Sequence, residues 1–163
     1  MKALILYDSV YGNTEKIALA IGNALSSQED VSVVKVSDVK PDQFAGLSLL
    51  IVGAPTQRFR TTAAMSDLLK MIPENSLKGV KVAAFDTRLA QNEINKTPIL
   101  AFFVRLFGVN AYAARPIANQ LKKKGGKAIG APEGFFVEGM KGPLVDGELE
   151  RAINWARQLS LNA

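Results

Sequence analysis

The chain has 163 residues, 48% of them hydrophobic, and 20 Lys and Arg against 15 Asp and Glu give it a net charge of +5. This length and composition predict one folded domain, residues 1–163, and not a disordered chain. The chain has no cysteine and no histidine, which excludes disulfides, iron–sulfur clusters, thiol nucleophiles, Ser-His-Asp hydrolysis and histidine zinc sites. Any catalysis must therefore come from a cofactor or from carboxylate, Lys, Arg or Tyr side chains.

The sequence carries no sign of export or of a membrane span. Its first residues run directly into an apolar stretch, without the charged and apolar regions of a secretory signal. No apolar run approaches the roughly 20 residues that cross a bilayer. Together with the lack of cysteine, these features predict a cytoplasmic protein without a membrane span.

Apolar strand-like runs alternate with helix-like patterns along the chain. Residues 2–7 are apolar on both faces, as in a buried central strand. In the next segment, Ile17, Ile21 and Leu25 recur at helical spacing and form one apolar stripe. The predicted strands are 2–7, 31–36 at a sheet edge, 47–53, 80–85, and a last strand, 128–131 with 134–137, interrupted at Pro132. The predicted helices are 14–27, 63–72 after a Thr61 or Thr62 cap, 112–124, and 146–159 capped by Asp146, with a short helical turn at 41–46 that Asp38 would cap.

This alternation is typical of an α/β fold, in which a parallel sheet has helices on both faces. In open parallel sheets, ligands bind beyond the carboxyl ends of the strands. The segments after the first, third and fourth predicted strands are residues 8–14, 54–62 and 86–92. The sequence therefore predicts a ligand site where these three segments meet.

The segment from Asp8 to Thr14 connects a strand to a helix and predicts an anion site. The first N–H groups of a helix lack internal partners, and the helix dipole is positive at that end. The hydroxyls of Ser9, Tyr11 and Thr14 and the N–H groups of the turn would surround one phosphate, while Gly12 permits a positive φ. The segment contains no Lys or Arg, so neutral donors alone would hold the anion. The alternative is a plain turn that caps the helix.

The letters Ser-Val-Tyr-Gly-Asn-Thr resemble the flavodoxin phosphate loop, Ser/Thr-x-Thr-Gly-x-Ser/Thr, and more closely its variant in flavodoxin-like quinone reductases. Ser9, Gly12 and Thr14 match, while Tyr11 stands where flavodoxins usually have Thr. The resemblance implies a flavodoxin-like, three-layer, doubly wound fold with five parallel strands in the order 2-1-3-4-5, and FMN as the cofactor. It implies that the FMN phosphate is bound by Ser9, Val10, Tyr11, Gly12, Asn13 and Thr14.

The resemblance also places two further loops beside the flavin ring. Backbone groups of loop 54–62 would bind the pyrimidine edge, and Phe59 would cover a ring face or, alternatively, pack into the protein. Thr87 or the backbone near it would reach the ring. Arg88 would either reach the ring as well or, alternatively, form an ion pair with Asp86. No aromatic residue follows in this loop until Phe102, which would leave the outer ring face open to a substrate. The residues predicted from these two loops are Pro55, Thr56, Gln57, Arg58, Phe59, Asp86, Thr87 and Arg88.

The positive net charge departs from flavodoxins that carry electrons, which are typically strongly acidic. Arg58 and Arg60 beside the ring would favour the anionic reduced flavin and make its potential less negative; alternatively, both point into solvent. The net charge would serve an acidic partner, an anionic substrate or an anionic surface, or only solubility. No nucleic-acid partner is expected, because the charges are scattered without interleaved aromatic residues.

Residues 97–107, Thr-Pro-Ile-Leu-Ala-Phe-Phe-Val-Arg-Leu-Phe, are unusually apolar. They predict an ordinary core helix or, alternatively, a lid over the flavin, a homodimer surface or a docking patch. The variant Phe103→Asp separates these readings. Unfolding would favour the core helix, and a change in activity or oligomer size would favour a lid or an interface.

These features together predict an FMN-binding, flavodoxin-like electron-transfer protein. It would be either a carrier that exchanges electrons with a redox partner protein, or an NAD(P)H- or protein-dependent FMN reductase of quinones or similar small acceptors. A flavin-free interaction module on the same fold is a third alternative. The sequence does not decide between carrier and enzyme, and it assigns no catalytic side chain and no metal site.

Overall fold

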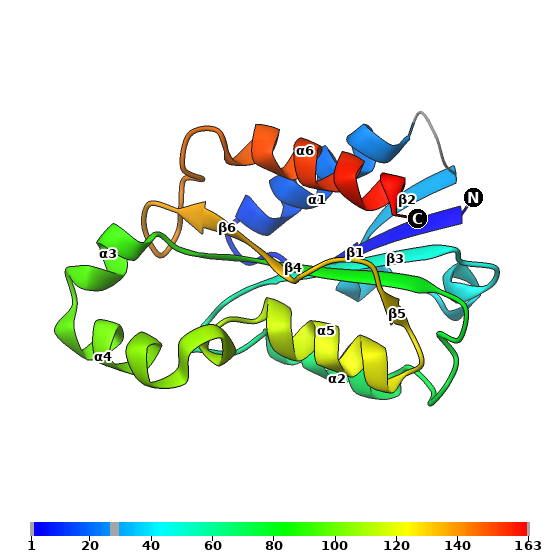
Figure 1. Cartoon of the computed structure of the whole chain (residues 1–163), viewed down its shortest axis with the longest axis horizontal. Coiled ribbons are helices and arrows are strands. Elements are labelled where there is room, and N and C mark those ends of the chain that lie inside the picture. The colour runs from blue at the N-terminus through cyan, green and yellow to red at the C-terminus, as the bar shows by residue number, and fades with distance from the viewer. Residues whose placement is uncertain (1, 27–29, 163) are drawn as a thin grey trace.

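The structure, a computed structural model, describes residues 2–26 and 30–162. A parallel sheet lies between two layers of helices (Figure 1). Helices α1 (Asn13–Leu25) and α6 (Glu148–Leu161) cover one face of the sheet, and α2 (Ala63–Met71) and α5 (Ala114–Lys123) cover the other. This is the three-layer, doubly wound α/β architecture that the sequence predicts.

The strands follow the order β2-β1-β3-β4-β5, and all of their pairings are parallel. A sixth short strand, β6, also pairs with β4, so β5 and β6 are two pieces of one edge strand, broken between residues 128 and 133 around Pro132. The predicted order and the predicted interruption are both confirmed. The strands are β1 (Lys2–Tyr7), β2 (Asp30–Lys35), β3 (Leu49–Pro55), β4 (Lys81–Leu89), β5 (Lys127–Ala128) and β6 (Glu133–Val137).

Alternation along the central strands divides the core between the two faces of the sheet. Leu4 and Leu6 of β1 point into the cluster that packs under α2 and α5. Ile5 of the same strand points into the opposite cluster, which contains Ile17 of α1 and Trp155 of α6. Successive side chains of a strand face opposite sides, so a strand apolar on both faces is buried on both. This burial fixes the register that brings the carboxyl ends of β1, β3 and β4 together.

Three local predictions are wrong. Strand β4 continues to Leu89, so residues 86–88 belong to the strand and not to a loop after it. Asp38 lies inside one 3₁₀ turn, Val36–Asp38, and Lys40 precedes the next, Pro41–Phe44. Helix α6 begins after Gly147, whose φ of 86° is left-handed, so Asp146 is not its cap. Thr62 does cap α2 as predicted, and residue 27 of the predicted first helix lies outside the described residues.

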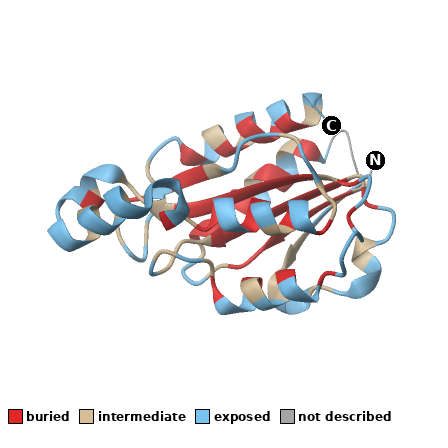
Figure 2. Ribbon diagram, turned by 60° about the horizontal axis from the view of Figure 1, so that its bottom comes forward, coloured by how far each residue is buried: buried red, intermediate tan, exposed pale blue. Residues whose placement is uncertain are grey.

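Between β4 and α5 the chain forms two helices that project beyond the carboxyl edge of the sheet (Figures 1 and 2). They are α3 (Gln91–Asn95) and α4 (Pro98–Phe107), followed by a 3₁₀ turn, Gly108–Ala111. No residue of α4 is buried. The prediction of a core helix at 97–107 is therefore wrong, because the segment continues past the end of the sheet and only one of its faces meets the protein body.

Candidate functional site

The loop after β1 forms the first wall of the candidate site. Gly12 precedes α1 with a φ of 83°, a left-handed conformation that favours glycine. A Cβ atom at this position would meet nothing within 4 Å, so the conformation and not the space requires glycine. The hydroxyl oxygen of Ser9 accepts from the backbone N–H of Gly12 at 3.1 Å and of Glu15 at 3.3 Å. Ser9 thus caps α1, although it is not the residue directly before the helix. Its hydroxyl only accepts in these bonds, so its hydrogen is available to donate.

The first turn of α1 keeps donors for a ligand. Among the described residues, no hydrogen bond satisfies the backbone N–H groups of Asn13 and Thr14. Both residues are buried, and the hydroxyl oxygen of Thr14 lies 2.7 Å from that of Thr87 on β4. One of these hydroxyls donates to the other, which leaves one hydrogen of the pair unused. Unpaired N–H groups at a helix N-terminus are suited to bind an anion.

Asp8 connects this loop to the next one, a role that the sequence analysis missed. One oxygen of its carboxylate accepts from the N–H of Ser9 at 2.9 Å, and the other accepts from the Thr62 hydroxyl at 2.5 Å. The Thr62 oxygen in turn accepts from the N–H of Met65 in the first turn of α2. The signal in the sequence is an Asp directly after a buried strand, although nothing in the sequence identifies Thr62 as its partner.

The loop after β3 is a tight turn that presents Phe59. Gln57 and Arg60 exchange backbone hydrogen bonds of 2.9 and 3.0 Å. The two residues between them, Arg58 and Phe59, have φ values of 48° and 64°, which are uncommon for side chains of this size. The turn directs the Phe59 ring toward Phe103 of α4, with 5.5 Å between ring centroids. Phe59 therefore packs against another exposed element and not into the sheet core, while Arg58 and Arg60 are exposed.

Several predicted site residues bond to other parts of the chain and so hold the loops around the candidate site in position. Thr56 donates its N–H to the Thr87 carbonyl at 2.9 Å and accepts at Oγ1 from the N–H of Ala113 at 2.9 Å. These bonds tie the end of β3 to β4 and to the residue before α5. Thr56 and Thr87 therefore hold the loops in place, and Pro55 is the last residue of β3.

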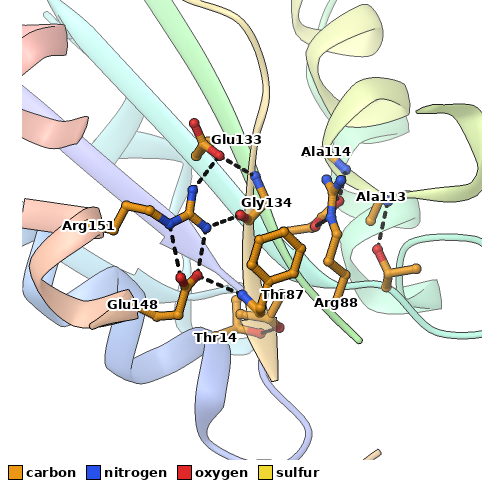
Figure 3. A network of polar contacts seen from close by, with 12 residues as sticks. Thr14, Thr87, Arg88, Ala113, Ala114, Glu133, Gly134, Glu148 and Arg151 are labelled. Atoms are coloured by element: carbon orange, nitrogen blue, oxygen red, sulfur yellow. Dashed lines mark hydrogen bonds and ion pairs between the residues drawn. The ribbon is translucent and has the colours of Figure 1, made fainter. Parts of the chain in front are cut away.

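Asp86 and Arg88 form a bidentate pair inside the protein, which is the second of the two roles predicted for Arg88. Figure 3 shows Arg88 near Ala114. The Arg88 donors lie 2.6 and 2.8 Å from the carboxylate oxygens of Asp86, which also accepts from the N–H of Ala114. Burial raises the pKa of Asp86, and the Arg88 guanidinium and the Ala114 N–H oppose that rise. Arg88 lies 3.8 Å from the centroid of the Tyr112 ring, and a Cβ on Gly134 would overlap its guanidinium. Arg88 is thus enclosed, and it is not a free anion ligand.

The segment after β6 brings a cation close to the loop after β1. Asn13 donates its side-chain N–H to the Lys141 carbonyl at 3.1 Å, and the Lys141 ammonium lies 6.0 Å from the centroid of the Tyr11 ring. Tyr11 is 48% exposed, so its ring is part of the surface of the site. The sequence analysis found no cation within residues 8–14, and the structure adds Lys141 beside this loop. Lys141 is far from the loop in sequence, so local spacing could not have identified it.

An ion-pair network anchors the strand that precedes Lys141 (Figure 3). Arg151 of α6 lies 2.8 Å from Glu133 and 2.6 Å from Glu148, and it also donates to the Gly134 carbonyl. Hydrogen bonding to Glu148 raises the pKa of Arg151. Glu148 accepts from the N–H of Phe136 as well, at 2.7 Å. The network joins α6 to β6 and so positions residues 138–147 beside α1.

Two hollows lie beside Phe59 and the projecting helices. The smaller, of about 90 Å³, is lined by residues that include Phe59, Arg88 and Tyr112. The larger, of about 420 Å³, is lined by Phe59, Leu89, Glu93, Thr97, Ile99, Leu100, Phe103, Gly139 and Met140. Only the larger one is in the range of small-molecule sites, about 300–1,000 Å³. It lies where the second loop, the end of β4 and the segment after β6 approach one another.

The sheet order and the unpaired N–H groups at its carboxyl edge are those of a doubly wound α/β protein with a candidate ligand site at the ends of its strands. A family model for the flavodoxin domain matches residues 4–131, most of the chain. The chain therefore belongs to the flavodoxin family.

Solved flavodoxin structures share the fold over the full length. A flavodoxin from the domain Archaea is 22% identical with a TM-score of 0.76, and the match covers 99% of this chain and 97% of that one. Flavodoxin 2 from Bacillus cereus is 19% identical with a TM-score of 0.77 and complete coverage of both chains. A flavodoxin, WrbA-like protein from Agrobacterium tumefaciens is 15% identical with a TM-score of 0.68, and the match covers 99% and 96%. Comparison with curated proteins gave no match.

Proposed function

We propose that this protein binds FMN and transfers electrons through it. The observation that carries the proposal is the phosphate loop, where the N–H groups of Asn13 and Thr14 are unpaired and the Ser9 hydroxyl retains its hydrogen. A phosphate monoester has three oxygens for these donors, and the helix dipole favours its charge. When bound, FMN supplies the chemistry of accepting and releasing one or two electrons.

The residues of the chain determine how the cofactor is held and reached. Ser9, Gly12, Asn13 and Thr14 would hold the phosphate, and Lys141 would add a positive charge beside it. The turn at Arg58 and Phe59 would border the ring. The projecting helices would exclude water from one side of the site. Thr56, Asp86, Thr87 and Arg88 act indirectly, because their bonds fix the positions of the loops.

The test is to titrate the purified protein with FMN and with riboflavin, which differ only in the phosphate. FMN should bind and quench its fluorescence, and riboflavin should bind at least about a hundredfold more weakly if several charge-assisted bonds hold the phosphate. Ser9→Ala should weaken FMN binding and leave riboflavin binding unchanged. If neither flavin binds, the protein is an interaction module on a flavodoxin fold. Equal binding of both flavins would mean that the loop after β1 is only a helix cap.

A reductase is the second candidate, and the hollow of about 420 Å³ favours it. Its wall is mostly apolar, with Leu89, Phe103 and Met140 around Phe59, and a flat, uncharged acceptor such as a quinone fits that chemistry. The assay is NAD(P)H consumption by the FMN-loaded protein with a soluble quinone. Turnover above that of free FMN identifies a reductase. Reduction of the flavin by a donor without turnover of a small acceptor identifies a carrier.

A further inference from the structure

Helix α4 leaves several large apolar side chains exposed. Leu100 and Val104 line the smaller hollow, while Ile99 is 73% exposed, Phe102 60% and Leu106 63%. Met140, 82% exposed, lines the larger hollow together with Ile99 and Phe103 and extends the surface from a distant part of the chain. We call this surface the α4 patch; it consists of Ile99, Phe102, Phe103, Leu106, Phe107 and Met140.

Lys and Arg occur along the whole chain, but their excess over Asp and Glu lies in the segment that contains this helix. Residues 94–132 carry seven Lys and Arg and no Asp or Glu. The rest of the chain has thirteen Lys and Arg and fifteen Asp and Glu, which makes it slightly acidic. The whole of the positive net charge therefore comes from these 39 residues, with α4 in their first half.

Exposed cations also surround the α4 patch in space. Lys96 and Arg105 lie on its own segment, and both are exposed. Arg58 and Arg60 flank Phe59, which contacts Phe103, and Lys141 follows Met140. The nearby acids are Glu93, which pairs with Lys96 at 2.6 Å, and the exposed Glu138. Around the patch, cations therefore outnumber acids.

A second copy of the chain is a poor partner for this surface. A ten-residue helix is about 15 Å long, whereas a stable protein interface needs about 20–30 residues a side. In a two-fold dimer through α4, the cationic segment of one copy would face that of the other, with no acid in residues 94–132 to pair with Arg105. The helix is also a projection and not a flat face (Figure 2).

A projecting, apolar and aromatic helix flanked by cations has the properties of an interfacial membrane anchor. Such helices bury their apolar side chains in the boundary between lipid headgroups and acyl chains, while Lys and Arg contact anionic lipids. We propose that α4 docks this protein on the surface of anionic lipid bilayers, with Phe102 and Leu106 inserted and Arg105 among the headgroups. None of the helices in the described part of the chain is long and apolar enough to cross a membrane, so the docking is peripheral. It does not depend on the cofactor.

Vesicle sedimentation tests this proposal. The full chain is mixed with vesicles of phosphatidylcholine, with or without phosphatidylglycerol at about a third of the lipid. We expect binding to the anionic vesicles, a decrease with added salt, and binding to neutral vesicles that is at least about tenfold weaker. Phe102→Asp with Leu106→Asp should lower binding by about tenfold or more, and Arg105→Glu by about fivefold or more.

The matched controls lie toward the C-terminal end of α6, the helix that covers the other face of the sheet from α5 (Figure 1). Leu161 is 87% exposed and Arg157 is exposed. Leu161→Asp repeats one of the two Asp substitutions of α4, and Arg157→Glu repeats the charge reversal of Arg105→Glu. Both should bind vesicles almost as well as the unchanged protein. Circular dichroism and FMN titration verify that the α4 variants fold. Phe102 and Leu106 line neither hollow, so FMN binding should not change.

Three results would overturn the proposal. They are no binding to anionic vesicles, equal binding to neutral and anionic vesicles, and equal losses from the α4 and the α6 variants. Two further results would assign the patch to another occupant. A dimer that light scattering detects without lipid and that Phe102→Asp dissociates would assign it to a second copy, and a soluble acidic protein that competes with the vesicles for α4 would assign it to a protein partner.

Discussion

The hydroxyl oxygens of Thr14 and Thr87 lie 2.7 Å apart and are buried, and this pair joins the first turn of α1 to β4. In Thr87→Val, a methyl group replaces the hydroxyl, and Thr14 loses its only described side-chain partner. We expect the free energy of unfolding to fall by about 1–3 kcal/mol, the cost of an unsatisfied buried hydroxyl. Urea unfolding measures this change. Thr87→Ser keeps the hydroxyl and should retain most of the stability, so equal losses in both variants would contradict the role given to this bond.

The fold could be predicted from the sequence because its signals are local. A run such as Ala3 to Leu6 is apolar on both faces, and it becomes a strand buried on both faces. The break of the last strand was equally readable, since proline cannot donate to a strand ladder. The end of β4 could not be predicted, because residues 86–88 are polar, as residues in loops usually are. They remain in the strand because Asp86 finds Arg88 and the N–H of Ala114 as partners.

The candidate site was only partly predictable, because its loops are completed by residues far apart in sequence. The Ser9-to-Thr14 pattern predicted a polar turn before α1, and the structure has that turn. Lys141, by contrast, reaches Tyr11 from 130 positions away through a segment that Arg151 anchors. Residues 97–107 were misjudged for another reason. Apolar side chains at helical spacing show that a helix has an apolar face, but not whether anything covers it.

The Asp86–Arg88 pair predicts an effect of pH. Arg88→Met leaves a buried carboxylate without its cation, and we expect a loss of about 3–5 kcal/mol in the free energy of unfolding at neutral pH. The change raises the folded-state pKa of Asp86 further above its unfolded value, near 4. The buried Asp86 carboxyl therefore does not destabilise the protein below about pH 4, and its destabilising effect grows from there until the pH reaches the folded-state pKa.

Urea unfolding of both proteins at several pH values from 4 to 8 measures this difference. The stability gap between Arg88→Met and the unchanged protein should narrow toward acid pH. Asp86→Asn combined with Arg88→Met should recover part of the loss, because no buried charge remains. A gap of constant size across this range would mean that Arg88 acts only through its packing on Tyr112.

The turn at residues 57–60 predicts a stabilising substitution. Arg58 is exposed and has a φ of 48°, a left-handed conformation that asparagine adopts at lower cost. Arg58→Asn should raise the free energy of unfolding by about 0.5–1 kcal/mol. The matched control is Arg60→Asn, which removes the same charge without relieving a positive φ. If the two variants are equally stable, the effect belongs to charge and not to the backbone.

Lys141 predicts a salt-dependent contribution to cofactor binding. Its ammonium approaches the Tyr11 ring, and Tyr11 is a residue of the phosphate loop. Lys141→Gln should weaken FMN binding by about three- to tenfold at low ionic strength, and the difference should shrink as salt is added. Riboflavin binding should not respond, because riboflavin has no phosphate. If both flavins lose the same affinity, Lys141 acts by stabilising the structure of residues 138–147 and not through the phosphate.

The exposed Arg58 and Arg60 predict a change in the flavin potential that follows from the proposed cofactor. One positive charge several Å from the ring stabilises an anionic reduced flavin by about 1–2 kcal/mol at an effective dielectric constant near 20, and solvent screening lowers this value. About 1 kcal/mol corresponds to about 45 mV for one electron. The double variant Arg58→Ala, Arg60→Ala should therefore make the potential of the second electron more negative by tens of mV. Arg157→Ala on α6 is the control for net charge alone, and a potential that shifts equally in both proteins would show that the two arginines do not act on the flavin.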